Sequence, residues 1–159
     1  MTNLILNIVF FMLYLTFFIV SDKMLENRIQ GKYYLFHFIN NLFVTFYTYP
    51  NILQCFSDLY NYSSYITNIQ TILITVALHM YHVIIYFNKL RFDDWLHHIL
   101  MILIVAPIST YMNVGCLLGF GLFFLSGLPG GIDYLLLFLV RNNIIDRMVE
   151  KKINTNINL

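Results

Sequence analysis

Seven ionisable residues of this sequence have the types and spacing needed to move protons. They are His37, His79, His82, Asp94, His97, His98 and Asp133. Imidazole takes up and releases a proton near neutral pH, and a nearby carboxylate can hold its ring in position. His79 and His82 are three residues apart, and Asp94 precedes His97 and His98 by three and four, so each set shares a face if its segment is helical. General acid–base chemistry is the reaction type that this pattern indicates.

These side chains must be carried by membrane helices, because the composition excludes an ordinary soluble fold. Of 159 residues, 59% are hydrophobic and 11% are charged, whereas soluble domains have roughly 25% charged residues. Each bilayer crossing needs about 20 mostly apolar residues. We therefore expect a single all-α transmembrane helical bundle over residues 1–159 with about five spans, at 3–20, 33–49, 66–87, 95–111 and 114–140, followed by a tail at 141–159.

The last apolar stretch is too long for one straight crossing, because its 27 residues at about 1.5 Å each exceed a hydrocarbon core of ~30 Å. It contains Gly127, Pro129, Gly130 and Gly131. Proline removes a backbone donor and glycine loosens a helix. We expect a fifth span broken at 127–131. A six-span arrangement, in which the stretch divides at these glycines, is the alternative.

Lysine and arginine indicate the orientation, because cytosolic loops carry an excess of them. All nine lie in the segments 23–32, 89–91 and 141–152, which fall on one side of the membrane if there are five spans. The N-terminus is then lumenal or external, and the C-terminus is cytosolic. The loop at 50–65 on the opposite side contains the glycosylation sequon Asn61-Tyr62-Ser63. A formal net charge of +1 provides no basic field for nucleic acid.

All the candidate residues fall in the cytosolic half of the predicted bundle, at most about 13 Å from the cytosolic ends of their spans. Ionisable groups are costly inside a bilayer and mark functional sites. We predict a His/Asp pocket in which His97, His98 and Asp133 share a cavity, with His79, His82 and His37 lining it. The alternative is that the histidines only form hydrogen bonds between helices and that Asp94 is a solvated loop charge near Arg91.

The pattern predicts neither a bound metal nor another cofactor. Membrane di-iron hydroxylases and desaturases need repeated histidine boxes, whereas this sequence has five histidines without HxxxH or HxxHH. A bis-histidine haem would need paired ligands on facing helices. Cys55 and Cys116 lie far apart without a CxxC pattern, so we expect neither a zinc site nor a disulfide. Both are interpreted as buried apolar residues.

One region resembles a known family. His79-Met80-Tyr81-His82, followed by Arg91-Phe92-Asp93-Asp94-Trp95-Leu96-His97-His98 and an apolar continuation, is similar to the TLC-domain family, which includes ceramide synthases and translocating-chain-associated membrane proteins. The family signature is a double histidine that opens a helix after a short acidic cytosolic loop. The polar, helix-breaking segment 126–134 also resembles the family pattern, and the resemblance covers residues 33–140. The chain departs from ceramide synthases in having Asp133 alone where they carry a histidine and an acidic pair. It is also shorter than the usual domain.

The resemblance implies an endomembrane protein, of the endoplasmic reticulum, that acts on or senses lipid in a cytosol-facing pocket. The reaction it implies is acyl transfer in sphingolipid or related lipid metabolism, with membrane lipid and acyl-CoA as partners. His97 or His98 would be the general base and Asp94 or Asp133 would orient it. Two alternatives stay open: a non-catalytic lipid-binding or trafficking protein, and a small solute transporter with a broken helix at its substrate site.

Overall fold

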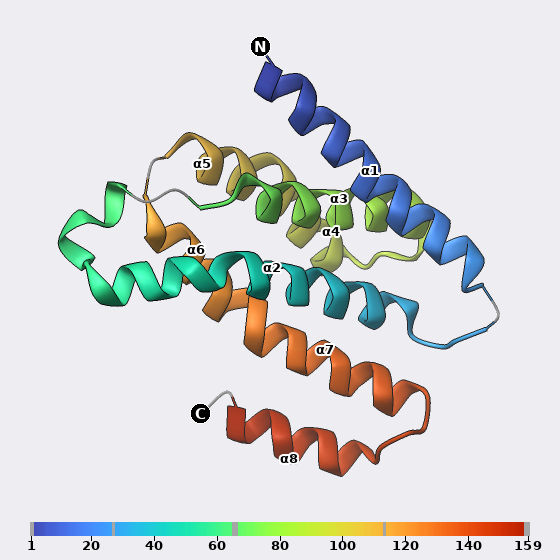
Figure 1. Cartoon of the computed structure of the whole chain (residues 1–159). Coiled ribbons are helices and arrows are strands. Elements are labelled where there is room, and N and C mark those ends of the chain that lie inside the picture. Colours follow the sequence, from blue (N-terminus) through green and yellow to red (C-terminus); the bar gives the residue numbers. More distant parts are fainter. Residues whose placement is uncertain (1, 27, 65–66, 113, 158–159) are drawn as a thin grey trace.

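The chain forms a bundle of helices, seen here in a computed structural model that describes residues 2–26, 28–64, 67–112 and 114–157. The α-helices are α1 (Thr2–Met24), α2 (Lys32–Ser57), α3 (Ile69–Tyr86), α4 (Phe92–Leu100), α5 (Ala106–Tyr111), α6 (Cys116–Leu122), α7 (Leu128–Arg141) and α8 (Arg147–Ile157) (Figure 1). The predicted start of the third span at residue 66, the turn residue 113 and the end of the tail at 158–159 lie outside the described residues. The predicted all-α class is confirmed.

Four helical stretches of the described chain are long and apolar enough to cross a membrane. They are Leu4–Met24, Ile69–Lys89, Phe92–Tyr111 and Cys116–Arg141. Large apolar side chains point outward from the bundle, among them Leu125, Leu103 and Leu4. Soluble monomers rarely expose so much apolar surface, and such a surface is suited to contact with lipid. The protein is therefore an integral membrane protein, and four of the five predicted spans correspond to these stretches.

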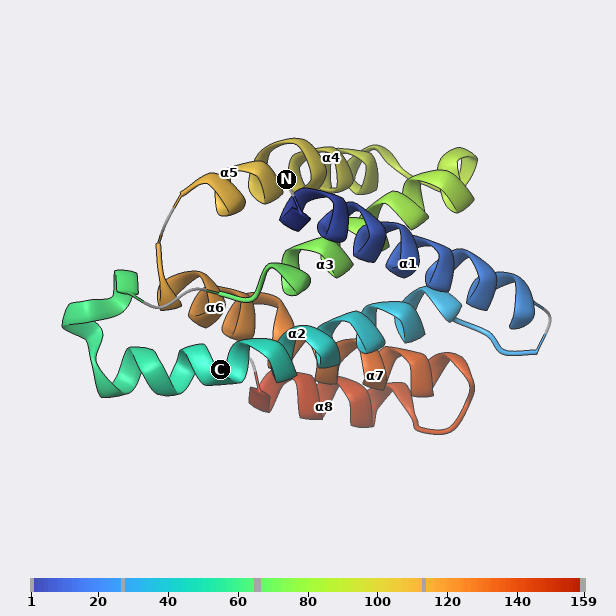
Figure 2. The ribbon, with the colours of Figure 1, turned by 45° about the horizontal axis from the view of Figure 1, so that its top comes forward.

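The remaining predicted span, at 33–49, corresponds to α2, which is long but carries more polar residues than the other four. Asn40, Asn41, Thr48 and Asn51 are all buried on it. Helix α2 lies at the centre of the fold, packed against α3 on one side and against α6 and α7 on the other (Figures 1 and 2). Its polar side chains therefore meet protein rather than lipid, where interhelical packing and hydrogen bonds can accommodate them.

The predicted break of the last span takes the form of a widened helical turn. Phe123–Gly127 is π-helical and α7 begins at the next residue, with a bend between α6 and α7 (Figure 1). Pro129 cannot donate a backbone hydrogen bond, and its ring crowds the carbonyl one turn earlier, which a wider turn relieves. The same arrangement precedes Pro107, where Met101–Val105 is π-helical. The chain thus forms a widened helical turn before Pro107 and before Pro129 and remains helical.

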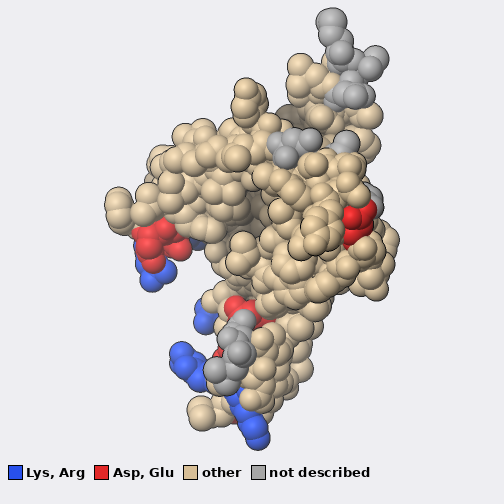
Figure 3. Space-filling view, turned by 90° about the vertical axis from the view of Figure 1, so that its left-hand side faces the viewer, with Lys and Arg blue, Asp and Glu red and all other residues tan. Residues whose placement is uncertain are grey.

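The connections α1–α2, α3–α4 and α7–α8, which contain basic residues or are flanked by them, lie at one end of the bundle (Figures 1 and 2). Two hydrogen bonds join the first and last of them: Asn142 Nδ2 donates to the Gln30 carbonyl at 2.9 Å, and the Gln30 N–H donates to Asn142 Oδ1 at 3.2 Å. Figure 3 looks onto the opposite end, where lysine and arginine appear only toward the left edge and the lower part. These three connections therefore lie at the same end of the bundle, while Lys151 and Lys152 lie further along α8.

A buried ion pair holds α1 to its neighbours at the basic end. The Lys32 ammonium lies 2.8 Å from Asp22 Oδ1, and the Tyr81 hydroxyl donates to the same oxygen at 2.8 Å. Beneath it, Phe18, Phe36 and Tyr81 form the centre of the apolar core with their rings 5.4–5.8 Å apart. Because the Asp22 carboxylate has both a cation and a hydroxyl donor, its burial is compensated.

The opposite end is held by a disulfide between Cys55 at the end of α2 and Cys116 at the start of α6, with their Cα atoms 5.9 Å apart. The expectation of two unpaired apolar cysteines is therefore wrong. The two residues are 61 positions apart in the sequence, and only the packing of α2 against α6 brings them together. Gly115, just before Cys116, has φ +58°, and a Cβ there would collide with the backbone of Tyr62. Only glycine fits at that position.

Glycines on α6 and α7 allow close contact with the polar face of α2. A Cβ added to Gly119 would lie 2.6 Å from the Cβ of Asn51, and one added to Gly130 would lie 2.8 Å from Asn41 Nδ2. Small residues commonly let membrane helices approach in this way. The glycines of the last span therefore serve helix packing as well as bending.

We expect Gly119→Ala to lower the free energy of unfolding by about 1–3 kcal/mol, because the added methyl group overpacks against Asn51. Gly121→Ala is the matched control, since nothing lies within 4 Å of a Cβ added at that position of the same helix. Thermal unfolding of the purified protein in detergent measures both. Equal midpoints for the two variants would contradict the close packing.

The tail predicted at 141–159 contains a further helix. Helix α8 runs back beside α7 (Figures 1 and 2), and the Asn154 amide donates to Asp133 Oδ1 at 2.7 Å. Glu150 on the same helix is buried. The end of the described chain is therefore packed on the bundle.

Candidate functional site

All five histidines of the sequence meet in one cluster near the basic end of the bundle. His37 comes from α2, His79 and His82 from α3, and His97 and His98 from α4. Their rings form a continuous series: His37–His82 at 4.8 Å, His82–His98 at 5.3 Å, His98–His79 at 5.2 Å and His79–His97 at 5.1 Å between centroids. The gathering of the predicted histidines into one site is the main feature that the fold creates.

The closest contact in this histidine cluster joins His79 to His97. Their Nε2 atoms are 3.2 Å apart, and His79 Nδ1 lies 2.7 Å from the Thr75 carbonyl. A carbonyl only accepts hydrogen bonds, so Nδ1 of His79 carries the proton, and its Nε2 is an acceptor in the neutral ring. His97 then donates from Nε2. This assignment leaves His97 Nδ1 as an unprotonated lone pair on a side chain that is exposed at the bundle surface.

His82 and His98 are buried without hydrogen bonds. In each ring, neither nitrogen has a partner among the described residues, and the exposed fractions are 0% and 1%. Imidazole nitrogens without partners are costly in a buried place. A hydrogen-bonding water molecule or a metal ion would stabilise them, so the two rings are open positions for a ligand.

Two tyrosines, which the sequence analysis missed, extend the histidine cluster. His37 stacks on Tyr134 of α7 with centroids 4.2 Å apart, and Tyr33 lies 4.5 Å from both His37 and His82. The contact of Tyr33 could have been predicted from the sequence, because Tyr33 precedes His37 by four residues and lies on the same helix face. Tyr134 was not, since its contact depends on how α7 packs on α2.

The two predicted orienting carboxylates have other partners. Asp94 Oδ2 accepts from the backbone N–H of Arg91 at 3.1 Å and from its Nε at 3.4 Å. The bond from the guanidinium raises the pKa of Arg91. Asp133 accepts from Asn154 on α8. Within residues 2–26, 28–64, 67–112 and 114–157, neither carboxylate is hydrogen-bonded to a histidine. The group that orients an imidazole is instead the backbone carbonyl of Thr75.

Asp94 is drawn to Arg91 for a local reason. It is the third residue of α4, and Arg91 precedes the helix. A carboxylate at this position satisfies a free N–H at the helix start and interacts favourably with the positive end of the helix dipole. The neighbouring guanidinium adds a charge-assisted bond. Asp94 therefore anchors the start of the helix that presents His97 and His98.

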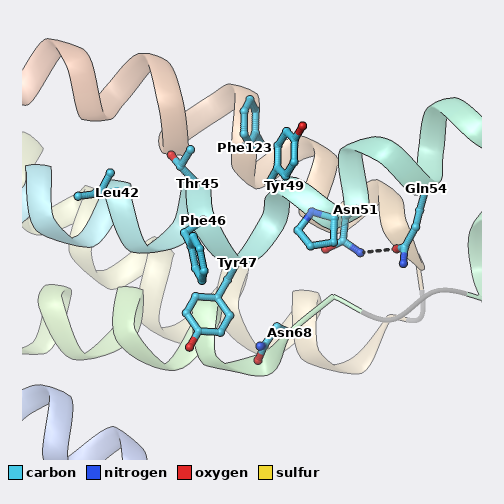
Figure 4. A pocket seen from close by; sticks show the side chains of 10 residues that line it. Leu42, Thr45, Phe46, Tyr47, Tyr49, Asn51, Gln54, Asn68 and Phe123 are labelled. Atoms are coloured by element: carbon cyan, nitrogen blue, oxygen red, sulfur yellow. Dashed lines mark hydrogen bonds between the residues drawn. The ribbon is translucent and has the colours of Figure 1, made fainter.

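A large cavity lies away from the histidines. It is a groove of about 620 Å³ along the second half of α2, lined by aromatic side chains such as Phe46, Tyr47 and Tyr49 and by the hydrogen-bonded pair Asn51 and Gln54 (Figure 4). A second cavity, of about 20 Å³, touches His79 between α3 and the π-helical turn Met101–Val105. That is room for about one water molecule. A large substrate does not fit there, and among the five histidines His97 is the one exposed at the surface.

No known protein family, curated protein or solved structure matches this sequence. The chemistry of the cluster must therefore be argued from its own residues. Five imidazoles with one exposed member, a tautomer held by a backbone carbonyl and two unpartnered buried rings can transfer protons or bind a metal ion.

Proposed function

We propose that this protein acts on membrane lipid, with the histidine cluster as its reaction centre in the cytosol-facing half of the bilayer. One observation carries the proposal: His97 is exposed at the bundle surface while its Nε2 is bonded to buried His79, which leaves Nδ1 available as a base. Its neighbours Leu96, Ile99 and Leu100 on α4 are exposed apolar residues. A substrate that reaches this base therefore approaches along an apolar surface, as a lipid does.

The reaction that we propose is acyl transfer, as the resemblance of 91–98 to TLC-domain proteins implies. His97 Nδ1 takes the proton from the hydroxyl or amine of a lipid acceptor as that atom attacks the carbonyl of an acyl-CoA thioester. The new ester or amide bond forms, the carbon–sulfur bond breaks, and the imidazolium returns the proton to the leaving thiolate. The bond to His79 lets the positive charge of the intermediate imidazolium spread over two rings.

We further propose that α2 crosses the membrane as the fifth span, with the basic end of the bundle in the cytosol. Its 26 residues correspond to about 39 Å of helix, enough for a bilayer core of ~30 Å. The disulfide supports this orientation, because disulfides persist in oxidising compartments and Cys55–Cys116 lies at the end opposite the basic connections. In the proposed orientation, the disulfide lies in the lumen of an endomembrane such as the endoplasmic reticulum.

The test of the function is lipid analysis of membranes from cells with and without the protein, followed by reconstitution with acyl-CoA donors in vesicles. The proposal expects a lipid class whose abundance rises with expression and whose formation in vesicles requires both an acceptor and an acyl-CoA. An unchanged lipid profile, together with no acyl transfer in vesicles, would refute it. Lipid that copurifies without being converted would favour a lipid-binding protein instead.

The topology makes a separate prediction. Single cysteines introduced at Asn142 and at Asn61, in a variant lacking the native pair, are expected to react with a membrane-impermeant reagent from opposite sides of sealed vesicles. Both positions lie between long helices, in segments that contain exposed residues. Labelling of both from the same side would exclude five spans.

A further inference from the structure

We propose that His79, His97 and His98 together bind one divalent transition-metal ion, Zn²⁺ in the first place. This goes beyond the proposed function, because an ion can bind to these three side chains whether or not they act on lipid. One ligand nitrogen from each ring lies within 4.8 Å of the others. The sequence predicts no metal, because spacing along the chain does not show that these three rings meet in the fold.

The distance between the first two ligands already suits a metal. Zinc–nitrogen bonds of about 2.0–2.1 Å at tetrahedral angles separate two ligand atoms by about 3.3 Å, and the Nε2 atoms of His79 and His97 are 3.2 Å apart. The third nitrogen, on His98, has to approach by about 1.5 Å at most to complete this geometry. An ion would replace the proton that His79 and His97 share.

The hydrogen bonding around the site also suits a metal. Histidines that bind a metal usually donate their other ring N–H to a carboxylate or a backbone carbonyl, which fixes the tautomer. His79 does this through Nδ1 to Thr75, and its Nε2 lone pair then points at His97. His98 is 1% exposed, and both of its nitrogens lack a partner among the described residues. A ligand bond would satisfy one of them.

Three neutral imidazoles favour zinc over the hard ions magnesium and calcium, which prefer oxygen ligands. Three protein ligands also leave a fourth position open to water or substrate, as in catalytic zinc sites. The cavity of about 20 Å³ beside His79 has room for a small occupant of this kind.

The metal would change the identity of the base in the proposed reaction. With the ion on Nε2, His97 Nδ1 carries a proton and no longer accepts one. Water bound to zinc has a pKa near 7 in well-studied sites, so the hydroxide formed from it would be the group able to accept the proton from the lipid. The metal-free and zinc-bound proteins therefore use the same cluster in two different ways.

The test uses the full chain, purified in detergent with an affinity tag that contains no histidine, and Zn²⁺ measured by elemental analysis. We expect about one zinc per chain in the wild type. His79→Ala and His98→Ala should each reduce the zinc content at least tenfold. His37→Ala is the matched control, because His37 belongs to the cluster and is not among the three ligands, and it should keep about one zinc per chain.

A second measurement guards against variants that fail to fold. His97 is exposed, so His97→Cys should preserve the bundle and offer a thiolate ligand in place of imidazole. After Co²⁺ is substituted for Zn²⁺, the wild type should show the visible absorption of a tetrahedral site, and His97→Cys should add a thiolate-to-cobalt charge-transfer band. An unchanged cobalt spectrum in His97→Cys overturns the site, as does a wild-type zinc content no higher than that of His79→Ala.

The two proposals can fail separately. A protein that binds one zinc per chain and leaves every lipid unchanged would keep the metal site and lose the proposed function. A protein that holds no zinc and still transfers acyl groups would keep the function and lose the metal site.

Discussion

Replacing both His97 and His98 by alanine is expected to abolish the lipid change that expression of this protein causes. Loss of a general base costs about 10²- to 10⁴-fold in rate. The exposed lone pair of His97 is the base of the proposed reaction, and His98 is replaced with it because the sequence pattern indicates either histidine as the base. The measurement is the amount of lipid product per inserted protein molecule, with protein level quantified in the same membranes.

A purely structural role for the two histidines gives a different result. Losing an interhelical hydrogen bond in a membrane costs about 0.6–2 kcal/mol, which lowers abundance or thermal stability and preserves the product formed per molecule. Leu96→Ala is the matched control, because Leu96 lies beside His97 on α4 and is exposed. If the double variant forms as much lipid product per inserted protein molecule as the wild type, catalysis by His97 and His98 is ruled out.

Breaking the disulfide is expected to have the largest effect on stability. A crosslink that closes a loop of this length stabilises a protein by about 2–4 kcal/mol. We expect a value near the lower figure, because the unfolded chain keeps its helices in the bilayer and is already restricted without the crosslink. Cys55→Ser should therefore lower the thermal midpoint of the purified protein. Without reductant, a thiol-reactive polymer should leave the wild type unmodified, and after reduction it should add two increments of mass.

The single variant also provides the control for this labelling. Cys55→Ser leaves Cys116 as a free thiol, so one increment should appear after denaturation without reductant. Two increments in the denatured, unreduced wild type would mean that the bond between Cys55 and Cys116 does not form in the membrane. The result also bears on orientation, since an oxidised pair indicates the lumenal or external side.

Helix α2 explains why apolar composition alone is an incomplete guide to this bundle. A helix that faces lipid must be apolar, whereas a central helix meets other helices and can carry amides and hydroxyls. Asn41 and Asn51 lie opposite glycines of the last span, and His37 stacks between His82 and Tyr134. The helix with the weakest membrane signal therefore organises the site.

Several features of this protein follow from the sequence alone, because they depend on short stretches. Low charge and long apolar runs require membrane helices. Pro129 and the glycines around it produce a bend wherever the helix packs, since the missing donor is a property of the residue. The double histidine at 97–98 and the pair His79 and His82 identified the residues of the site, because ionisable groups in a bilayer need partners.

Spacing along the sequence did not decide how these residues are used, and the contacts between helices were decided only by the tertiary structure. Asp94 has the spacing to meet His97 or His98, but Arg91 has an equally suitable spacing and also offers a free N–H and a positive charge, so it takes the carboxylate. Cys55 and Cys116 pair, and His79 meets His97, because helices distant in the sequence pack side by side. Spacing within one helix shows which side chains share a face. Which face meets which depends on the packing of the whole bundle, where glycine contacts and buried polar groups allow few arrangements.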